Sequence, residues 1–211
     1  MIKAVLFDMD GVLVDSFEAW FRLVNSASNE FDYPDISRQQ FKSVYGQSTA
    51  LDVALFFPGR TVLEIDNYYE NHFYDFKEFV YPAPECHATV EELTRLGVNL
   101  AVITNTAGSL AREILKDLDI GIDCIIGGDE VANGKPAPDI VFKACDLLGV
   151  SVEETILVGD SIYDMEAAKA SGSCPIGING AVGDCTICLL YTSAAADERS
   201  SVDLGGRRII K

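Results

Sequence analysis

Two carboxylates stand two residues apart, directly after a short apolar run near the start of the chain. The run covers residues 3–7 and is followed by Asp8, Met9, Asp10 and Gly11. Such a run indicates a buried parallel strand, and α/β sheets bind ligands at the carboxyl ends of their strands. Carboxylates placed there offer a nucleophile and an acid. A plain strand-ending turn is the alternative when this motif is taken alone.

Two further apolar runs lead to polar residues of other types. The run 98–104 ends in Thr104 and Asn105, whose hydroxyl and backbone N–H groups could bind an anion if a helix starts there. The run 124–126 is followed by Lys135, directly before a helix that we expect to start at a proline. Its ammonium group could reach the same edge of the sheet. Taken singly, these residues could also be a helix cap and a surface charge.

A fourth run supplies two more carboxylates. The run 155–158 leads to Asp160, and Asp164 lies four residues further on, on the same side if a helix starts there. Asp160 alone could also be a helix cap. However, four strand ends that bring a nucleophile, a hydroxyl, a cation and an acid to one crevice are not explained by caps.

The elements that must position these residues alternate along the chain. Apolar positions at helical spacing separate the strand-like runs, around residues 90–96, 110–118 and 140–148, and a weaker strand-like run covers 175–178. Strands that alternate with helices predict a doubly wound, Rossmann-like α/β core with a parallel sheet covered on both faces.

Residues 16–80, which we call the insertion, break this alternation. They contain nine of the eleven Phe residues and the only Trp, and their pattern predicts helices. The simplest interpretation is an α-helical cap domain with its own small core, which returns through a proline-containing linker at 81–84. The core domain would then comprise residues 1–15 and 81–211. The expected cap helices cover about 17–30, 37–44, 49–57 and 61–79.

The charge balance limits the possible partners. The chain has 211 residues, and its 16 Lys and Arg against 33 Asp and Glu give a formal charge of −17. Nucleic acids and anionic membranes are bound by clustered basic residues, so neither is an expected partner. No apolar run reaches the roughly 20 residues of a membrane span, and the first one is too short for a signal peptide. We therefore expect a cytoplasmic protein.

One cysteine pair could have chemistry of its own. Cys185 and Cys188 form a CxxC motif, which could be redox-active or half of a zinc site. A second CxxC is absent from the sequence, and both histidines lie far away in sequence, so we favour neither role.

The four strand-end motifs occur in an order that resembles the haloacid-dehalogenase-like (HAD) hydrolase superfamily. Within it, the chain is similar to the branch with a small helical cap, which includes the phosphoglycolate phosphatase and β-phosphoglucomutase-like group. The resemblance covers residues 1 to about 180. The matching stretches are 7–16, 102–105, 127–131 with 134–140, and 158–164. From about residue 185 the sequence departs from the family pattern, which leaves a divergent end or a non-native segment as interpretations.

The resemblance implies Mg²⁺ as cofactor and a role for each acidic residue. Asp8 would bind the metal through its side chain and act as the nucleophile that forms an aspartyl-phosphate. The backbone carbonyl of Asp10 and the side chain of Asp160 would complete the protein ligands, and Asp164 would orient them from the second sphere. The side chain of Asp10 would serve as general acid and base. An acid at this place favours phosphoester chemistry over cleavage of a carbon–halogen bond.

The resemblance also implies a phosphate site and a substrate loop. Thr104, the Asn105 backbone and Lys135 would hold the phosphoryl oxygens. Gly46 and Gln47 belong to a stretch that resembles the glycine-containing loop which relatives place over the site. A simple turn between helices is the alternative for this loop.

These residues together predict a Mg²⁺-dependent phosphatase that hydrolyses a small phosphorylated metabolite of the phosphoglycolate or sugar phosphate type. A phosphomutase and a non-catalytic phosphometabolite-binding protein are the alternatives. The insertion is acidic and has few cations for a second phosphate, which favours hydrolysis. The intact set of acids, hydroxyl and lysine argues against a binding module. We expect a monomer or homodimer that binds neither nucleic acid nor a membrane.

Overall fold

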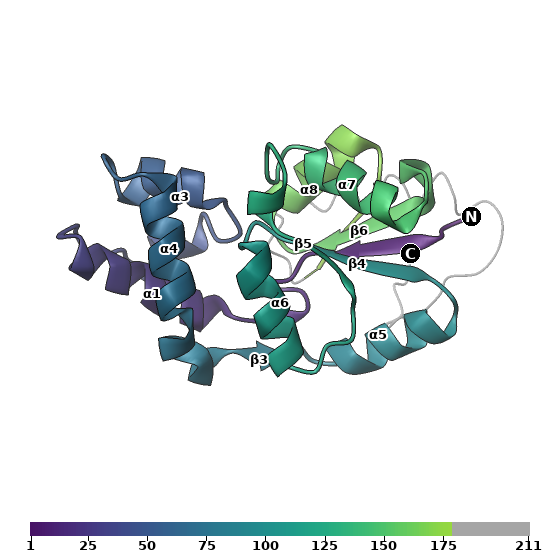
Figure 1. Cartoon of the computed structure of the whole chain (residues 1–211), viewed down its shortest axis with the longest axis horizontal. Coiled ribbons are helices and arrows are strands. Elements are labelled where there is room, and N and C mark those ends of the chain that lie inside the picture. The colour runs from purple at the N-terminus through teal and green to yellow at the C-terminus, as the bar shows by residue number, and fades with distance from the viewer. Residues whose placement is uncertain (179–211) are drawn as a thin grey trace, which may run out of the picture.

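The central feature of the computed structural model, which describes residues 1–178, is a parallel five-stranded sheet (Figure 1). Its strand order is β5-β4-β1-β6-β7. The bounds are β1 (Ala4–Phe7), β4 (Asn99–Ile103), β5 (Cys124–Ile126), β6 (Thr155–Gly159) and β7 (Cys174–Gly177). The register places Phe7 opposite Val102 of β4 and Val158 of β6. The residues that follow these three strands therefore emerge at one edge of the sheet.

Helices cover both faces of this sheet, which confirms the predicted doubly wound α/β class. In Figure 1, α7 and α8 lie on one face and α5 and α6 on the other. Two apolar clusters correspond to these faces, because alternate strand residues point to opposite sides: Phe7 belongs to one cluster and Leu6 to the other. The bounds are α5 (Cys86–Arg95), α6 (Gly108–Asp117), α7 (Asp139–Leu148) and α8 (Ile162–Ser171), with short 3₁₀ turns η2 (Gly128–Glu130) and η3 (Val152–Glu154).

The insertion forms a helical group at one end of the sheet (Figure 1). It contains α1 (Phe17–Glu30), α2 (Arg38–Lys42), α3 (Thr49–Phe56), α4 (Val62–His72) and the 3₁₀ segment η1 (Phe73–Phe79). The chain enters and leaves it through a two-stranded antiparallel ribbon of β2 (Val14–Asp15) and β3 (Tyr81–Pro82). The proline-containing stretch expected as a linker is therefore paired in part. The division of the chain into two domains stays a prediction.

Two expected helices differ from the observed ones. The helix expected over 61–79 is interrupted, because α4 ends at His72 and Phe76 has non-helical backbone angles. The helix expected directly after Lys135 begins only at Asp139, with Pro138 as its N-cap residue. The intervening residues form turns, so Lys135 lies in a loop rather than at a helix start.

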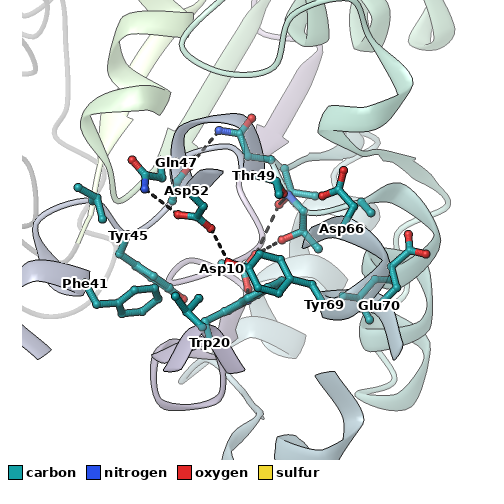
Figure 2. A pocket seen from close by; sticks show the side chains of 18 of the residues that line it. Asp10, Trp20, Phe41, Tyr45, Gln47, Thr49, Asp52, Asp66, Tyr69 and Glu70 are labelled. Atoms are coloured by element: carbon teal, nitrogen blue, oxygen red, sulfur yellow. Dashed lines mark hydrogen bonds between the residues drawn. The ribbon is translucent and has the colours of Figure 1, made fainter. Parts of the chain in front are cut away.

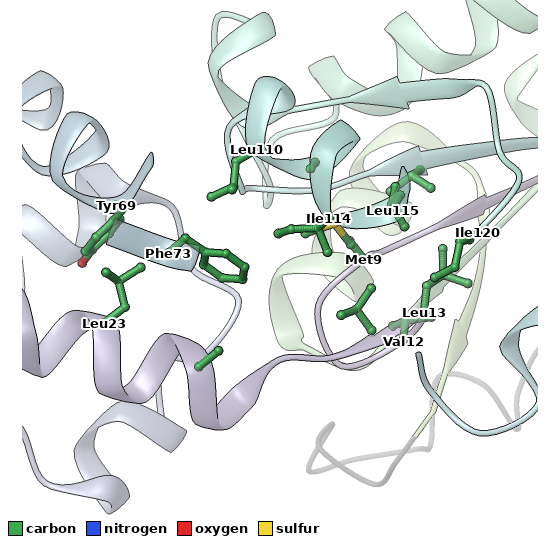
Figure 3. Packing of buried hydrophobic residues seen from close by; sticks show 14 of the residues in the cluster. Met9, Val12, Leu13, Leu23, Tyr69, Phe73, Leu110, Ile114, Leu115 and Ile120 are labelled. Carbon is green, nitrogen blue, oxygen red and sulfur yellow. The ribbon is translucent and has the colours of Figure 1, made fainter. Parts of the chain in front are cut away.

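The insertion does not have the separate small core that we expected. One apolar cluster continues from Leu23 and Phe73 in the insertion to Leu110 and Ile114 of α6 and on to Met9 beside the sheet (Figure 3). Phe73 is 1% exposed. Shared burial of this kind ties the insertion to α6, because separating them would return these side chains to water.

Among residues 1–178, no helix combines the length and the apolar character that crossing a bilayer requires. The atypical sequence from residue 185, with Cys185 and Cys188, lies outside the described residues.

Truncation of Phe73 tests the shared cluster. We expect Phe73→Ala to lower the free energy of unfolding by about 3–5 kcal/mol, because it leaves a large cavity in a fully packed region. Phe142→Ala is the matched control: Phe142 is 45% exposed, so its loss is expected at about 0.5 kcal/mol or less. Urea denaturation measures both. Equal losses for the two variants would contradict the central position of Phe73.

Candidate active site

Lys135 joins two of the other predicted site residues, Asp8 and Asp164, in the interior of the protein. Its ammonium donates hydrogen bonds to Asp8 Oδ1 at 2.7 Å, to Asp164 Oδ1 at 2.6 Å and to the Ile103 carbonyl at 3.0 Å. Lys135 is 2% exposed and Asp164 is fully buried. These contacts bring together the end of β1, the loop before α7 and the first turn of α8, as the strand-end motifs predict.

The cluster of charged residues around Lys135 has an excess of negative charge. Burial alone lowers the pKa of Lys135, but the charges of Asp164 and Asp8 outweigh burial and raise it above its ordinary value. Burial, and next the charge of Asp164, raises the pKa of Asp8 well above its usual range. Asp10 and Asp160 lie close enough to Asp8 to raise it further. This cluster therefore contains four carboxyl groups but one ammonium, and that ammonium contacts only Asp8 and Asp164.

Three carboxylates of this group fit a divalent cation. Asp8, Asp160 and Asp164 each place an oxygen within 4.8 Å of the others. Asp160 Oδ1 is buried and has no hydrogen-bond partner among the described residues. Burial, and next the charge of Asp164, raises the pKa of Asp160 to about 7. Mg²⁺ prefers oxygen ligands, and here three buried carboxylates lie close together while one of their oxygens has no hydrogen bond.

The hydrogen bonds of Asp164 connect Lys135 to the start of α8. Its Oδ2 accepts from the Ser161 backbone N–H at 3.1 Å and from Ser161 Oγ at 2.5 Å, in a capping box at the start of α8. Its Oδ1 accepts from Lys135. Both oxygens are therefore engaged, whereas Asp160 Oδ1 is not.

Gly11 allows Asp160 to approach the chain after β1. Its φ is +83°, and a Cβ atom at this position would lie 2.0 Å from Asp160 Oδ2. A side chain here would displace the Asp160 carboxylate, so the turn requires glycine for both its backbone angle and its space.

Asp10 is held by four donors, three of which the sequence did not indicate. Asp10 Oδ1 accepts from Ser16 Oγ at 2.5 Å and from Trp20 Nε1 at 2.8 Å. Its Oδ2 accepts from Thr106 Oγ1 at 2.8 Å and, at the limit of 3.5 Å, from Thr104 Oγ1. The first two donors come from the start of the insertion and the other two follow β4. Thr106 stands two residues after the Thr104 motif, whereas Trp20 has the pattern of an ordinary core residue.

Thr104 and Asn105 do not stand at a helix start, contrary to expectation. Helix α6 begins at Gly108, and Thr104 Oγ1 instead accepts from the Thr106 backbone N–H at 3.1 Å. The Asn105 side chain donates to the carbonyls of Gly46 and Lys135, both at 3.0 Å. Asn105 therefore links the loop of the insertion to the loop that carries Lys135.

A small cavity of about 60 Å³ lies between the sheet edge and the insertion (Figure 2). The predicted residues that line it are Asp8, Asp10, Gly46, Gln47, Thr104 and Asn105. Lys135 and Asp160 are not among its lining residues. Asp160 lines a neighbouring cavity of about 370 Å³ and Lys135 another of about 520 Å³. The cavity is far smaller than the roughly 300–1,000 Å³ of pockets for drug-sized ligands, so it suits a small compound.

Asp52 is a buried acid on the insertion side of the cavity that the sequence did not indicate. Its two oxygens accept from Gln47 Nε2 at 2.7 Å and from the Tyr69 hydroxyl at 3.0 Å. Burial raises the pKa of Asp52 to about 6. No sequence motif surrounds Asp52. Its burial results from the packing of α3 against α4, which the local sequence does not indicate.

Comparison with known proteins matches residues 5–178 to the family described as haloacid dehalogenase-like hydrolase. A phosphoglycolate phosphatase from Neisseria meningitidis is 31% identical, covering 88% of this chain and 84% of the relative. The pyrophosphatase PpaX of Halalkalibacterium halodurans is also 31% identical, covering 81% and 80%. The structure of CbbY from Rhodobacter sphaeroides in complex with phosphate has a TM-score of 0.68 and 26% identity, covering 84% and 86%. Relatives named for different substrates thus have the same percentage identity to this chain.

The buried charge of Asp52 predicts a pH-dependent stability. The folded pKa of about 6 exceeds the ordinary 3.8, so the folded protein holds a proton that the unfolded chain has lost. Stability contributed by this group is therefore lost as pH rises from about 4 to about 6. Asp52→Asn removes the charge, and we expect it to stabilise the protein by about 1–3 kcal/mol at pH 7.5 and by progressively less toward pH 4.

Urea denaturation across this pH range measures the difference. Asp35→Asn is the control, because Asp35 is an exposed acid of the same insertion. A gain at Asp52 that does not change with pH would contradict the electrostatic origin.

Proposed function

The chain belongs to the haloacid dehalogenase-like hydrolase family, and we propose that it is a Mg²⁺-dependent phosphatase that hydrolyses small phosphate monoesters through Asp8. The observation that supports this most directly is the buried contact of Lys135 with Asp8 and Asp164 beside the unsatisfied oxygen of Asp160. A phosphate monoester is a dianion, so a carboxylate that attacks it needs compensating positive charge. We further infer that residues 16–80 act as a cap domain over the site.

The proposed metal ligands are the side chains of Asp8 and Asp160 and the backbone carbonyl of Asp10. Bound there, Mg²⁺ supplies the positive charge that offsets repulsion between the attacking carboxylate and the phosphate. Asp164 would keep Lys135 and the start of α8 in place, because both of its oxygens are engaged by them.

The first chemical step joins Asp8 to phosphorus. Lys135 and the Met9 backbone N–H both donate to Asp8 Oδ1, so we assign the attack to Oδ2. A bond forms between this oxygen and phosphorus while the bond between phosphorus and the ester oxygen breaks. Asp10 gives a proton to the departing oxygen, which leaves as an alcohol.

The second step returns the enzyme to its starting state. A water molecule attacks the phosphorus of the aspartyl-phosphate, and Asp10, now a carboxylate, accepts its proton. The bond between phosphorus and Asp8 breaks, which releases inorganic phosphate and restores the Asp8 carboxylate. The net reaction converts one ester and one water into one alcohol and one phosphate.

The phosphoryl oxygens would be held by Thr104, the Asn105 backbone N–H and Lys135. A lysine ammonium has three N–H donors, and here Asp8, Asp164 and the Ile103 carbonyl occupy them. Lys135 would therefore act on the arriving phosphate through its charge, and would redirect its N–H from Asp8 once Asp8 is esterified. Gly46 and Gln47 line the cavity and would contact the leaving group.

Hydrolysis is favoured over phosphomutase chemistry by the insertion side of the cavity. A mutase binds a second phosphate group, for which Lys or Arg is the usual partner. None of the described residues that line the cavity is a Lys or an Arg.

Replacement of the nucleophile tests the reaction. We expect Asp8→Asn to lower phosphate release by at least about 10³-fold, because the amide is not a nucleophile for phosphorus. The measurement is release of inorganic phosphate from p-nitrophenyl phosphate and a panel of phosphorylated metabolites with Mg²⁺. Chelation by EDTA should abolish activity of the unaltered protein, and added Mg²⁺ should restore it. Activity that survives Asp8→Asn in a folded variant refutes the assignment.

Trp20 tests the positioning of Asp10. Trp20→Phe removes the N–H donor at Asp10 Oδ1 but keeps a ring beside Tyr69 and Phe73. We expect kcat to fall about 10-fold with KM within about twofold, because proton transfer depends on the orientation of Asp10.

Tyr33→Phe is the control for Trp20→Phe. It removes a hydrogen bond to the Pro58 carbonyl in the same insertion, away from the cavity, and should leave both constants unchanged. A change in KM alone for Trp20→Phe would show that the indole contacts substrate instead of positioning Asp10.

A further inference from the structure

The wall of the cavity that the insertion provides is acidic. Asp52, Asp66 and Glu70 all line the cavity of about 60 Å³ that also contains Asp8 and Asp10. Figure 2 shows Asp66 and Glu70 next to each other, as expected for residues four positions apart on α4. None of the described residues that line the cavity is a Lys, an Arg or a His.

The partners of these three acids are uncharged. Asp52 accepts from Gln47 and Tyr69. Asp66 is hydrogen-bonded to Thr49, and Glu70 accepts from Ser109 Oγ at 2.9 Å.

The ion pairs that the structure shows within the insertion involve other acids, namely Glu18 and Glu64. The negative charges of this wall are therefore not neutralised by the protein in the described part of the chain.

In the proposed reaction, this acidic wall would face the leaving group of the substrate rather than its phosphoryl group. The phosphoryl group must lie at Asp8, beside the positive charge of Lys135 and the proposed metal. The leaving group then extends toward the insertion, because the cavity has these two sides. A second anionic group on the substrate would lie among like charges in a space of restricted hydration, whereas a hydroxyl or an ammonium group could donate hydrogen bonds to the carboxylates.

We propose that the acidic wall of Asp52, Asp66 and Glu70 selects phosphate monoesters whose leaving group donates hydrogen bonds and carries no second anion. Esters of polyols and of aminoalcohols have this chemistry. Esters with a carboxylate and substrates with a second phosphate group do not. The selection rests on the phosphatase function proposed above, and it separates this chain from relatives that are named for phosphoglycolate or pyrophosphate.

A matched series of two-carbon esters tests the selection. The compounds are 2-phosphoglycolate, 2-hydroxyethyl phosphate and phosphoethanolamine, which differ only in a carboxylate, a hydroxyl or an ammonium at the far end. We expect kcat/KM for the hydroxyl or the ammonium ester to exceed that for 2-phosphoglycolate by at least about 10-fold. Preference for the ammonium ester would show that the wall selects its substrate by ion pairing with the carboxylates. Preference for the hydroxyl ester would show that it does so by hydrogen bonding alone.

The outcomes distinguish failure of the proposed selection from failure of the proposed phosphatase function. An equal or higher kcat/KM for 2-phosphoglycolate overturns the selection but leaves the phosphatase function intact. Absence of phosphate release from all three esters and from p-nitrophenyl phosphate, with Mg²⁺ present, overturns the phosphatase function and the selection with it.

A charge-matched pair of double variants locates the effect. We expect Asp66→Asn with Glu70→Gln to raise the ratio of kcat/KM for 2-phosphoglycolate over 2-hydroxyethyl phosphate by at least about 10-fold. Asp35→Asn with Glu78→Gln removes the same charge from exposed positions of the insertion outside the cavity and should leave the ratio unchanged. An unchanged ratio in the wall variant, or an equal change in the control, overturns the proposal.

Discussion

The buried ammonium of Lys135 is the contact on which the rest of the site depends. It lies between Asp8 and Asp164, which are 127 and 29 residues away in the sequence. A buried charge is tolerated only when its partners are in place, and removal of one partner typically costs about 3–5 kcal/mol. The loop before α7 must therefore approach the ends of β1 and β6 closely. This requirement explains why a region without regular secondary structure is fixed beside the sheet.

The same contact leaves the site short of positive charge. Lys135 engages Asp8 and Asp164, but Asp10 and Asp160 lie within the same electrostatic field. Burial raises the pKa values of Asp8 and Asp160, so the carboxylate form of each is destabilised in the protein alone. A divalent cation would remove this conflict and would also supply the positive charge that a phosphate dianion needs. In the proposed function, metal binding and substrate binding would thus both follow from the same excess of negative charge.

The strand ends could be predicted from the sequence because they rest on local patterns. Short apolar runs fix β1, β4 and β6, and the parallel register then brings Asp8, Thr104 and Asp160 to one edge. Trp20 and Asp52 could not be predicted, since their roles arise where helices of the insertion pack over that edge. The interruption of α4 at Phe73 was missed for a similar reason, because the helical spacing of the apolar residues continues past it.

The charged residues at the cavity differ between its two sides, and in the proposed function this difference would orient the substrate. Near its sheet side, carboxylates lie beside Lys135 and the proposed metal, an arrangement that would attract phosphate. On the insertion side, carboxylates are accompanied by neutral donors only, which would favour groups that donate hydrogen bonds. A substrate with an anion at one end and a hydroxyl or ammonium at the other would fit this arrangement in one orientation. Asp52 is buried, and burial raises its pKa to about 6, so its carboxylate form lowers stability at neutral pH. We infer that contact with substrate, rather than the needs of folding, accounts for a carboxylate in such a place.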